Sequence, residues 1–164
     1  MDFFATIQRR HSVRVYKENP VSEKLLKTII DAGRLAATAR NIQPWEFVII
    51  QNKQKLASLG KQTDHGGFIA TAPVCIAVLC ENTKYYLEDG SAAMQNMLLA
   101  ATALGLGACW VAGDKKHYAD SIRAQLGAPE DYKLVALMPL GYIEGDPSVR
   151  HKRTSDDVIH WETF

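Results

Sequence analysis

Apolar residues recur at helical spacing in the first part of the chain. Asp2 can cap a short first helix, and Ser22 can cap a second helix within residues 19–39. The apolar stripe of the first helix consists of Phe3, Phe4 and Ile7, and that of the second of Leu25, Leu26, Ile29, Ile30 and Leu35. The chain is therefore expected to open with two amphipathic helices.

Strand patterns alternate with further helices from residue 47 onward. Strands are predicted at 47–50, 74–79, 108–112 and 134–140. The stretch 74–79 is apolar throughout, so we expect neighbours on both of its faces. Pro139 is tolerated only near an edge or an end of its strand, because it has no N–H to donate. Helices are predicted at 53–59, ending near Gly60, at 87–104, and at 114–126, ending at Gly127.

The order of these elements predicts a single α+β domain over residues 1–164, with a four- to five-stranded sheet around one long helix. That helix is apolar nearly all round over much of its length, which is typical of a buried central helix. The irregular tail carries Val158, Ile159, Trp161 and Phe164. These side chains are expected either to pack on a partner subunit or to fold back on their own domain.

Composition excludes several classes of protein. The 19 basic and 18 acidic residues give a net charge of +1, which argues against a dedicated nucleic-acid binder. No apolar run approaches the ~20 residues that span a bilayer, and the N-terminus does not resemble a secretory signal. We therefore expect a cytoplasmic protein with neither nucleic acid nor membrane as a partner.

The three cysteines, Cys75, Cys80 and Cys109, form no disulfide framework. Cys75 and Cys80 are an odd number of residues apart in a predicted strand, so they are expected on opposite faces. We therefore predict that the thiols are buried and that they form no metal site.

A basic cluster, Arg9-Arg10-His11-Ser12-Val13-Arg14, follows the first helix. If this segment is extended, Arg10, Ser12 and Arg14 share one face and can meet one phosphate. Taken alone, the segment is more typical of a solvated basic turn. A second cluster, Arg150, Lys152 and Arg153, can join the first only through folding or dimerisation.

Three other segments carry polar or glycine-rich patterns. Residues 41–45 (Asn-Ile-Gln-Pro-Trp) offer donors and acceptors suited to the edge of a heteroaromatic ring, or form a helix end with Trp45 in the core. Residues 105–113 lack the spacing of a dinucleotide fingerprint, and indicate a helix end followed by a buried strand. Asp89 opens the long helix and is expected to serve the helix dipole rather than chemistry.

Taken together, these segments resemble the FMN-dependent nitroreductase family over essentially the whole chain. The order and spacing carry the resemblance, which rests on residues 9–14, 41–45, 72–73, 89–96, 105–110, 139–142 and 160–162. It implies a nitroreductase-like fold with a mostly antiparallel sheet, and an intertwined homodimer with FMN at the subunit interface.

The resemblance also implies a set of cofactor-binding residues. Arg10, Ser12 and Arg14, with the neighbouring His11, would hold the FMN phosphate and ring edge with help from Lys152 and Arg153 of the tail. A loop of the other subunit would contribute Ala37, Thr38, Ala39, Asn41 and Gln43. The backbone amides of Ala112 and Gly113 would face N5 and O4 of the flavin. No residue is expected to be catalytic in its own right, because the flavin carries the chemistry.

This sequence departs from the family pattern in three places. Ala37-Thr38 stands where many members have Pro-Ser, and Lys152-Arg153-Thr154 stands where the tail usually reads Arg-Lys-Pro. The chain is also short for the family, which suggests a more open site.

The function implied is that of an oxidoreductase. Hydride would pass from NAD(P)H to flavin N5, and electrons would then pass to a nitroaromatic, a quinone or a similar small acceptor by ping-pong kinetics. The alternatives are a flavin-storage or redox-partner protein without turnover of its own, and an interaction domain that binds no flavin.

Overall fold

The computed structural model describes residues 2–146 and 151–164 and contains a five-stranded antiparallel sheet. The strand order is β1-β2-β5-β3, and β4 also pairs with β5. The strands are β1 (Trp45–Ile50), β2 (Val74–Glu81), β3 (Gly107–Ala108), β4 (Val111–Ala112) and β5 (Tyr132–Gly141). The fold class predicted from the sequence is confirmed.

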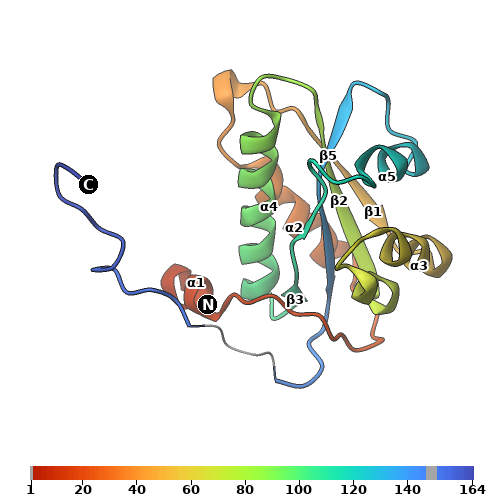
Figure 1. The fold of residues 1–164 in the computed structure, drawn as a ribbon. Helices are drawn as coiled ribbons and strands as arrows, with labels where there is room; N and C mark the ends of the chain where they lie inside the picture. The colour runs from red at the N-terminus through yellow and green to blue at the C-terminus, as the bar shows by residue number, and fades with distance from the viewer. Residues whose placement is uncertain (1, 147–150) are drawn as a thin grey trace.

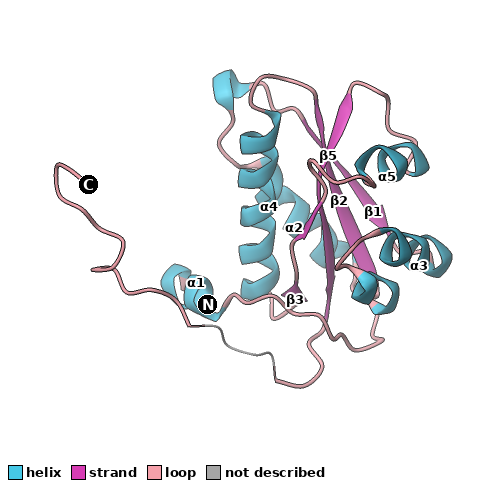
Figure 2. Ribbon diagram, viewed as in Figure 1, coloured by secondary structure: helices cyan, strands magenta, loops and turns pink. Residues whose placement is uncertain are grey.

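Helices cover both faces of the sheet (Figure 1). They are α1 (Phe3–Arg9), α2 (Glu23–Arg34), α3 (Lys53–Gln62), α4 (Tyr86–Ala103) and α5 (Ala119–Gln125), with short 3-10 turns at Ala39–Asn41 and Gly67–Thr71. The long helix α4 lies with α2 on one side of the strands, and α3 lies with α5 on the other (Figure 2). The two predicted N-caps are present, because Asp2 accepts hydrogen bonds from Phe4 and Ala5, and Ser22 accepts one from Leu25.

Strand β2 contributes to two cores, one on each face of the sheet. Ile76, Val78 and Cys80 belong to the core formed with Leu26, Ile29, Met94 and Met97 of α2 and α4. Cys75, Ala77 and Leu79 belong to the core formed with Leu56, Leu59 and Ile122 of α3 and α5. Each large apolar side chain buried this way contributes about 1.5–3 kcal/mol. The two-sided burial of β2 and the opposite placement of Cys75 and Cys80 are therefore confirmed, and all three thiols are free and buried.

The predicted strand 108–112 is observed as two short strands, β3 and β4, and the break between them begins opposite Pro139. β3 and β4 pair with β5 in the same register, which places Cys109 opposite Pro139. The Cys109 N–H donates to the Pro139 carbonyl over 3.2 Å, but proline has no N–H to return the bond. Pro139 lies near the end of β5, in an interior strand of the sheet, where its missing donor costs one ladder bond.

Helix α5 begins at Ala119 rather than near residue 114, so the predicted start was wrong. The Gly113 and Asp114 N–H groups both donate to the Val135 carbonyl, and Lys115 has a left-handed φ of 58°. The chain therefore stays attached to β5 and then turns before a helix can form.

The tail does not fold back on its own core. All of residues 151–164 are exposed, including Trp161 at 84%. Figure 1 shows the tail running past α1 and away from the sheet. Among the described residues, no helix combines the length and apolar character that a bilayer crossing requires.

Candidate functional site

The segment that follows α1 lies along the edge of β3 that does not pair with β5. The Val13 N–H donates to the Ala108 carbonyl over 3.0 Å, and Ser12 forms an isolated bridge with Ala108. This extended backbone sends alternate side chains to opposite sides. His11 and Val13 line a cavity of about 450 Å³ beside α1, whereas Arg14 lines a different one of about 250 Å³.

The basic cluster after α1 affects the buried Cys109 thiol. Burial raises the pKa of this thiol, while the charge of Arg14, a hydrogen bond with Ser12 and the charge of Arg10 each lower it. The Arg14 guanidinium donates to the Ser12 carbonyl over 3.3 Å, and a common site for Arg10, Ser12 and Arg14 remains a prediction. His11, which the sequence grouped with them, is not brought to the cavity of Arg14.

The cavity beside Arg14 is bounded by segments far apart in the sequence. Its lining residues are Arg14, His65, Phe68, Cys109, Trp110, Val111, Ala112, Lys116 and Tyr118. The Arg14 guanidinium lies 5.8 Å from the centre of the Phe68 ring. The cavity thus combines two cationic side chains, a histidine and an aromatic wall.

The hydrogen-bond pattern of β4 decides which backbone groups face this cavity. The N–H groups of Cys109 and Gly113 point to β5, where they donate to Pro139 and Val135. In an antiparallel ladder successive residues alternate in direction, so the N–H groups of Trp110 and Ala112 point the other way. The carbonyl of Ala112 accordingly accepts the Tyr118 hydroxyl over 2.7 Å, on the side away from β5. Of the two amides predicted to face a ring, that of Ala112 points outward and that of Gly113 is engaged in the sheet.

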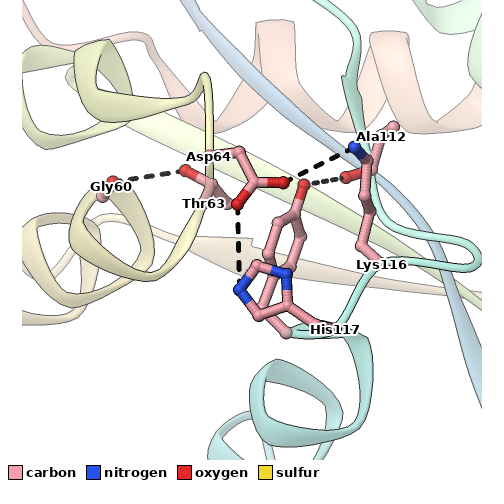
Figure 3. A network of polar contacts seen from close by, with 7 residues as sticks. Gly60, Thr63, Asp64, Ala112, Lys116 and His117 are labelled. Atoms are coloured by element: carbon pink, nitrogen blue, oxygen red, sulfur yellow. Dashed lines mark hydrogen bonds and ion pairs between the residues drawn. The ribbon is translucent and has the colours of Figure 1, made fainter.

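Asp64 joins the loop after α3 to the turn before α5 (Figure 3). Its carboxylate lies 3.5 Å from the Lys116 ammonium and 3.7 Å from Nε2 of His117. The same turn carries Tyr118, whose hydroxyl donates to Ala112. This network fixes Lys116 and the 62–67 loop at the mouth of the cavity.

The loop of residues 35–43 forms a second candidate surface, away from the first. Thr38 and Ala39 donate to the buried carboxylate of Asp89, over 2.9 and 3.1 Å respectively. Asn41 and Gln43 both have left-handed backbones. Ala37, Asn41 and Gln43 are exposed, and no residue of this loop lines the cavity of Arg14 within one chain.

Comparison with known proteins identifies the family. The model of a nitroreductase family, described as "Putative TM nitroreductase", matches residues 2–163. The chain belongs to the nitroreductase family. A relative from Methanothermobacter thermautotrophicus, named "Putative NADH dehydrogenase/NAD(P)H nitroreductase", is 33% identical, over 100% of this chain and 88% of its own.

Two further members of the family carry informative names. The FMN-dependent nitroreductase from Clostridium difficile R20291 superposes with a TM-score of 0.92 at 26% identity, over 99% of this chain and 100% of its own. The NADPH-flavin oxidoreductase of Vibrio harveyi is 26% identical, over 94% of this chain and 71% of its own. The nitroreductase-like fold expected from the sequence is thus confirmed.

Within this nitroreductase chain, the tail cations stand apart from the rest of the site. Lys152 and Arg153 are exposed and lie beyond residues 147–150, which are outside the described part of the structure. Arg150 of the second basic cluster falls within that gap. The residues described contain no group of three or more side chains that could hold a metal ion.

Sequence reasoning missed His65, Lys116 and Tyr118 as cavity residues. Their positions depend on the contact between the 62–67 loop and the turn before α5, for which the local sequence holds no signal. Ala37, Thr38, Ala39, Asn41 and Gln43 remain predictions as cofactor contacts, as do Lys152 and Arg153.

The first turn of α4 anchors the chain just after β4. The Tyr86 hydroxyl donates to the Asp114 carboxylate over 2.5 Å, and the Asp114 side chain is only 13% exposed. This hydrogen bond first, and burial second, raise the pKa of Tyr86 to about 12.

Replacing Tyr86 by Phe should therefore destabilise the protein in a pH-dependent way. The pKa of the folded state lies above the ordinary value of 10.0, so the contribution is fully present below pH 10 and is lost as pH rises toward about 12. Urea unfolding should show a deficit of about 0.5–1.5 kcal/mol for Tyr86→Phe at neutral pH, shrinking in alkali. The control is Tyr85→Phe, at the neighbouring tyrosine. A deficit that stays constant with pH would contradict this assignment.

Proposed function

We propose that this chain is an FMN-dependent oxidoreductase that takes hydride from NAD(P)H. The observation that carries the proposal is the cavity beside β4, where Arg14 and Phe68 lie around Ala112, whose N–H points away from β5. The names of two relatives, an FMN-dependent nitroreductase and an NADPH-flavin oxidoreductase, support the same cofactor and donor.

The residues present fit FMN. A phosphate needs charge-assisted donors, and the Arg14 guanidinium and the Lys116 ammonium provide them around one cavity. A flavin ring needs a flat apolar wall and a hydrogen-bond donor at its edge, which Phe68 and the Ala112 N–H provide around one cavity. Arg10, Ser12 and Arg14 would hold the phosphate and ring edge, and Ala112 would face the ring.

When bound, FMN supplies the redox chemistry, because its N5 accepts a hydride and the reduced ring passes electrons to a nitroaromatic, quinone or similar acceptor. The protein binds the cofactor and orients it. Lys116 lies at the cavity mouth and favours negative charge there, and Asp64 holds that ammonium in place. The Tyr118 hydroxyl bonds the Ala112 carbonyl and so restrains this residue on the side away from β5, the side to which its N–H also points.

A second copy of the chain would complete the site in our proposal. The loop with Ala37, Thr38, Ala39, Asn41 and Gln43 is separate from Arg14 in one chain, and Lys152 and Arg153 extend away on the tail. Large apolar side chains are exposed on two segments, Phe3, Phe4 and Ile7 of α1 and Val158, Ile159, Trp161 and Phe164 of the tail. Such surfaces are typical of an interface with another subunit.

Stopped-flow half-reactions test the function. NADH or NADPH alone should bleach the visible absorbance of the FMN-loaded protein, and a nitroaromatic or quinone added after removal of the donor should restore it. Flavin that NAD(P)H does not reduce would instead favour a storage or redox-partner protein. A need for donor and acceptor to be bound together would contradict the ping-pong sequence.

Arg14→Ala should weaken FMN binding, because it removes a charge-assisted hydrogen bond to the phosphate. The loss of about 1.5–3 kcal/mol corresponds to a ten- to hundredfold higher Kd in a fluorescence titration. Lys61→Ala removes an exposed cation elsewhere on the surface and is the control. Equal affinity in the two variants would remove Arg14 from the site.

A chain that ends at Asp157 should form a weaker dimer, because it lacks the four exposed apolar side chains of the tail. Size-exclusion mass across a dilution series measures this. A dimer that dilutes without change would show that the tail does not hold the partner subunit.

A further inference from the structure

The loop after α2 has a backbone that its own residues do not favour. Arg40, Asn41 and Gln43 have φ values of 56°, 56° and 55°, and none of them is glycine. Residues other than glycine in this region cost on the order of 1 kcal/mol or more, and they persist where surrounding structure imposes the conformation. Something outside the loop must therefore hold it.

Asp89 of α4 supplies that constraint. Its carboxylate is 5% exposed, and its two oxygens accept separate bonds, 2.9 Å from the Thr38 hydroxyl and 3.1 Å from the Ala39 N–H. The Thr38 hydroxyl oxygen in turn accepts the N–H of Gln43 over 3.2 Å. One buried carboxylate thus pins the start of the loop directly and its end through Thr38.

The surroundings of Asp89 leave these bonds as its main compensation for burial. Among the described residues it forms no ion pair. The sheet contributes the Cys80 thiol near it, and burial first and the charge of Asp89 second raise the pKa of that thiol. The carboxylate lies in the first turn of α4, where the helix dipole favours negative charge. The dipole role expected from the sequence is therefore joined by a second role toward the loop.

We propose that Asp89 is the positioning residue of this loop. Asp89 lies buried beneath the loop and holds residues 38–43 in the conformation that binds FMN. This inference rests on the proposed function, in which the loop reaches the cofactor of the second subunit.

The same turn of α4 supports the other half of the site. Tyr86 precedes Asp89 by three residues, so both side chains leave the helix on nearly the same side. Tyr86 holds Asp114 directly after β4, while Asp89 holds Thr38 and Ala39. One helical turn therefore positions both segments that the cofactor would contact.

The test compares Asp89→Asn and Thr38→Val with two matched controls, Glu88→Gln and Thr38→Ser. Asparagine keeps the shape but offers one acceptor oxygen, so one of the two donors loses its partner. Valine keeps the volume of Thr38 and removes the hydroxyl that links Asp89 to Gln43. Glu88 is an exposed neighbouring acid, and serine restores the hydroxyl.

Two measurements are made on each variant, amide exchange of residues 38–43 in the FMN-free protein and the Kd for FMN. Both Asp89→Asn and Thr38→Val should exchange faster in this loop and bind FMN about ten- to a hundredfold more weakly. Glu88→Gln should match the parent protein, and Thr38→Ser should exchange more slowly and bind FMN more tightly than Thr38→Val, because it keeps the hydroxyl.

The outcomes separate this inference from the proposed function. A parent protein that binds no FMN defeats the proposed function, and with it the cofactor role of Asp89, whatever the exchange data show. FMN binding by the parent together with an unchanged Kd in both variants overturns the inference alone. Thr38→Val keeps the test decisive if Asp89→Asn fails to fold.

Discussion

The pairing of β5 with residues 107–113 governs the rest of the site. Because Cys109 and Gly113 direct their N–H groups to β5, the alternate residues Ala108, Trp110 and Ala112 direct theirs to the opposite edge. That edge receives Val13 at Ala108 and the Tyr118 hydroxyl at Ala112. A shift of one residue in this register would exchange the residues that face β5 with those that face the opposite edge. It would bury the outward amide in the sheet and leave the segment of Arg14 without its docking carbonyl.

Much of the fold could be predicted because its signals are local. The unbroken apolar run of β2, the caps at Asp2 and Ser22, and the apolar length of α4 each act within a few residues. The start of α5 was missed because the Val135 carbonyl, distant in sequence, holds Gly113 and Asp114. Pro139 is an intermediate case. The sequence shows that it has no N–H to donate, but it does not show that Cys109 lies opposite it.

The candidate site was predictable in part for the same reason. Alternation along an extended segment predicts that Arg10, Ser12 and Arg14 share one side, and it places His11 in a different cavity from Arg14. Lys116 and His65 enter the cavity through a loop contact that no local pattern encodes. Asp89 was noticed only as a helix-terminal acid, because its two donors lie about fifty residues earlier in the chain.

If the loop that Asp89 holds and the segment of Arg14 contact different cofactors of a dimer, the arrangement has a genetic consequence. A chain damaged at Asp89 spoils the site to which it lends its loop, whereas a chain damaged at Arg14 spoils the site it keeps. When two such chains pair, both defects fall in one site and the other is built wholly from sound parts. Two inactive alleles would then complement each other, restoring half of the sites of the mixed dimer.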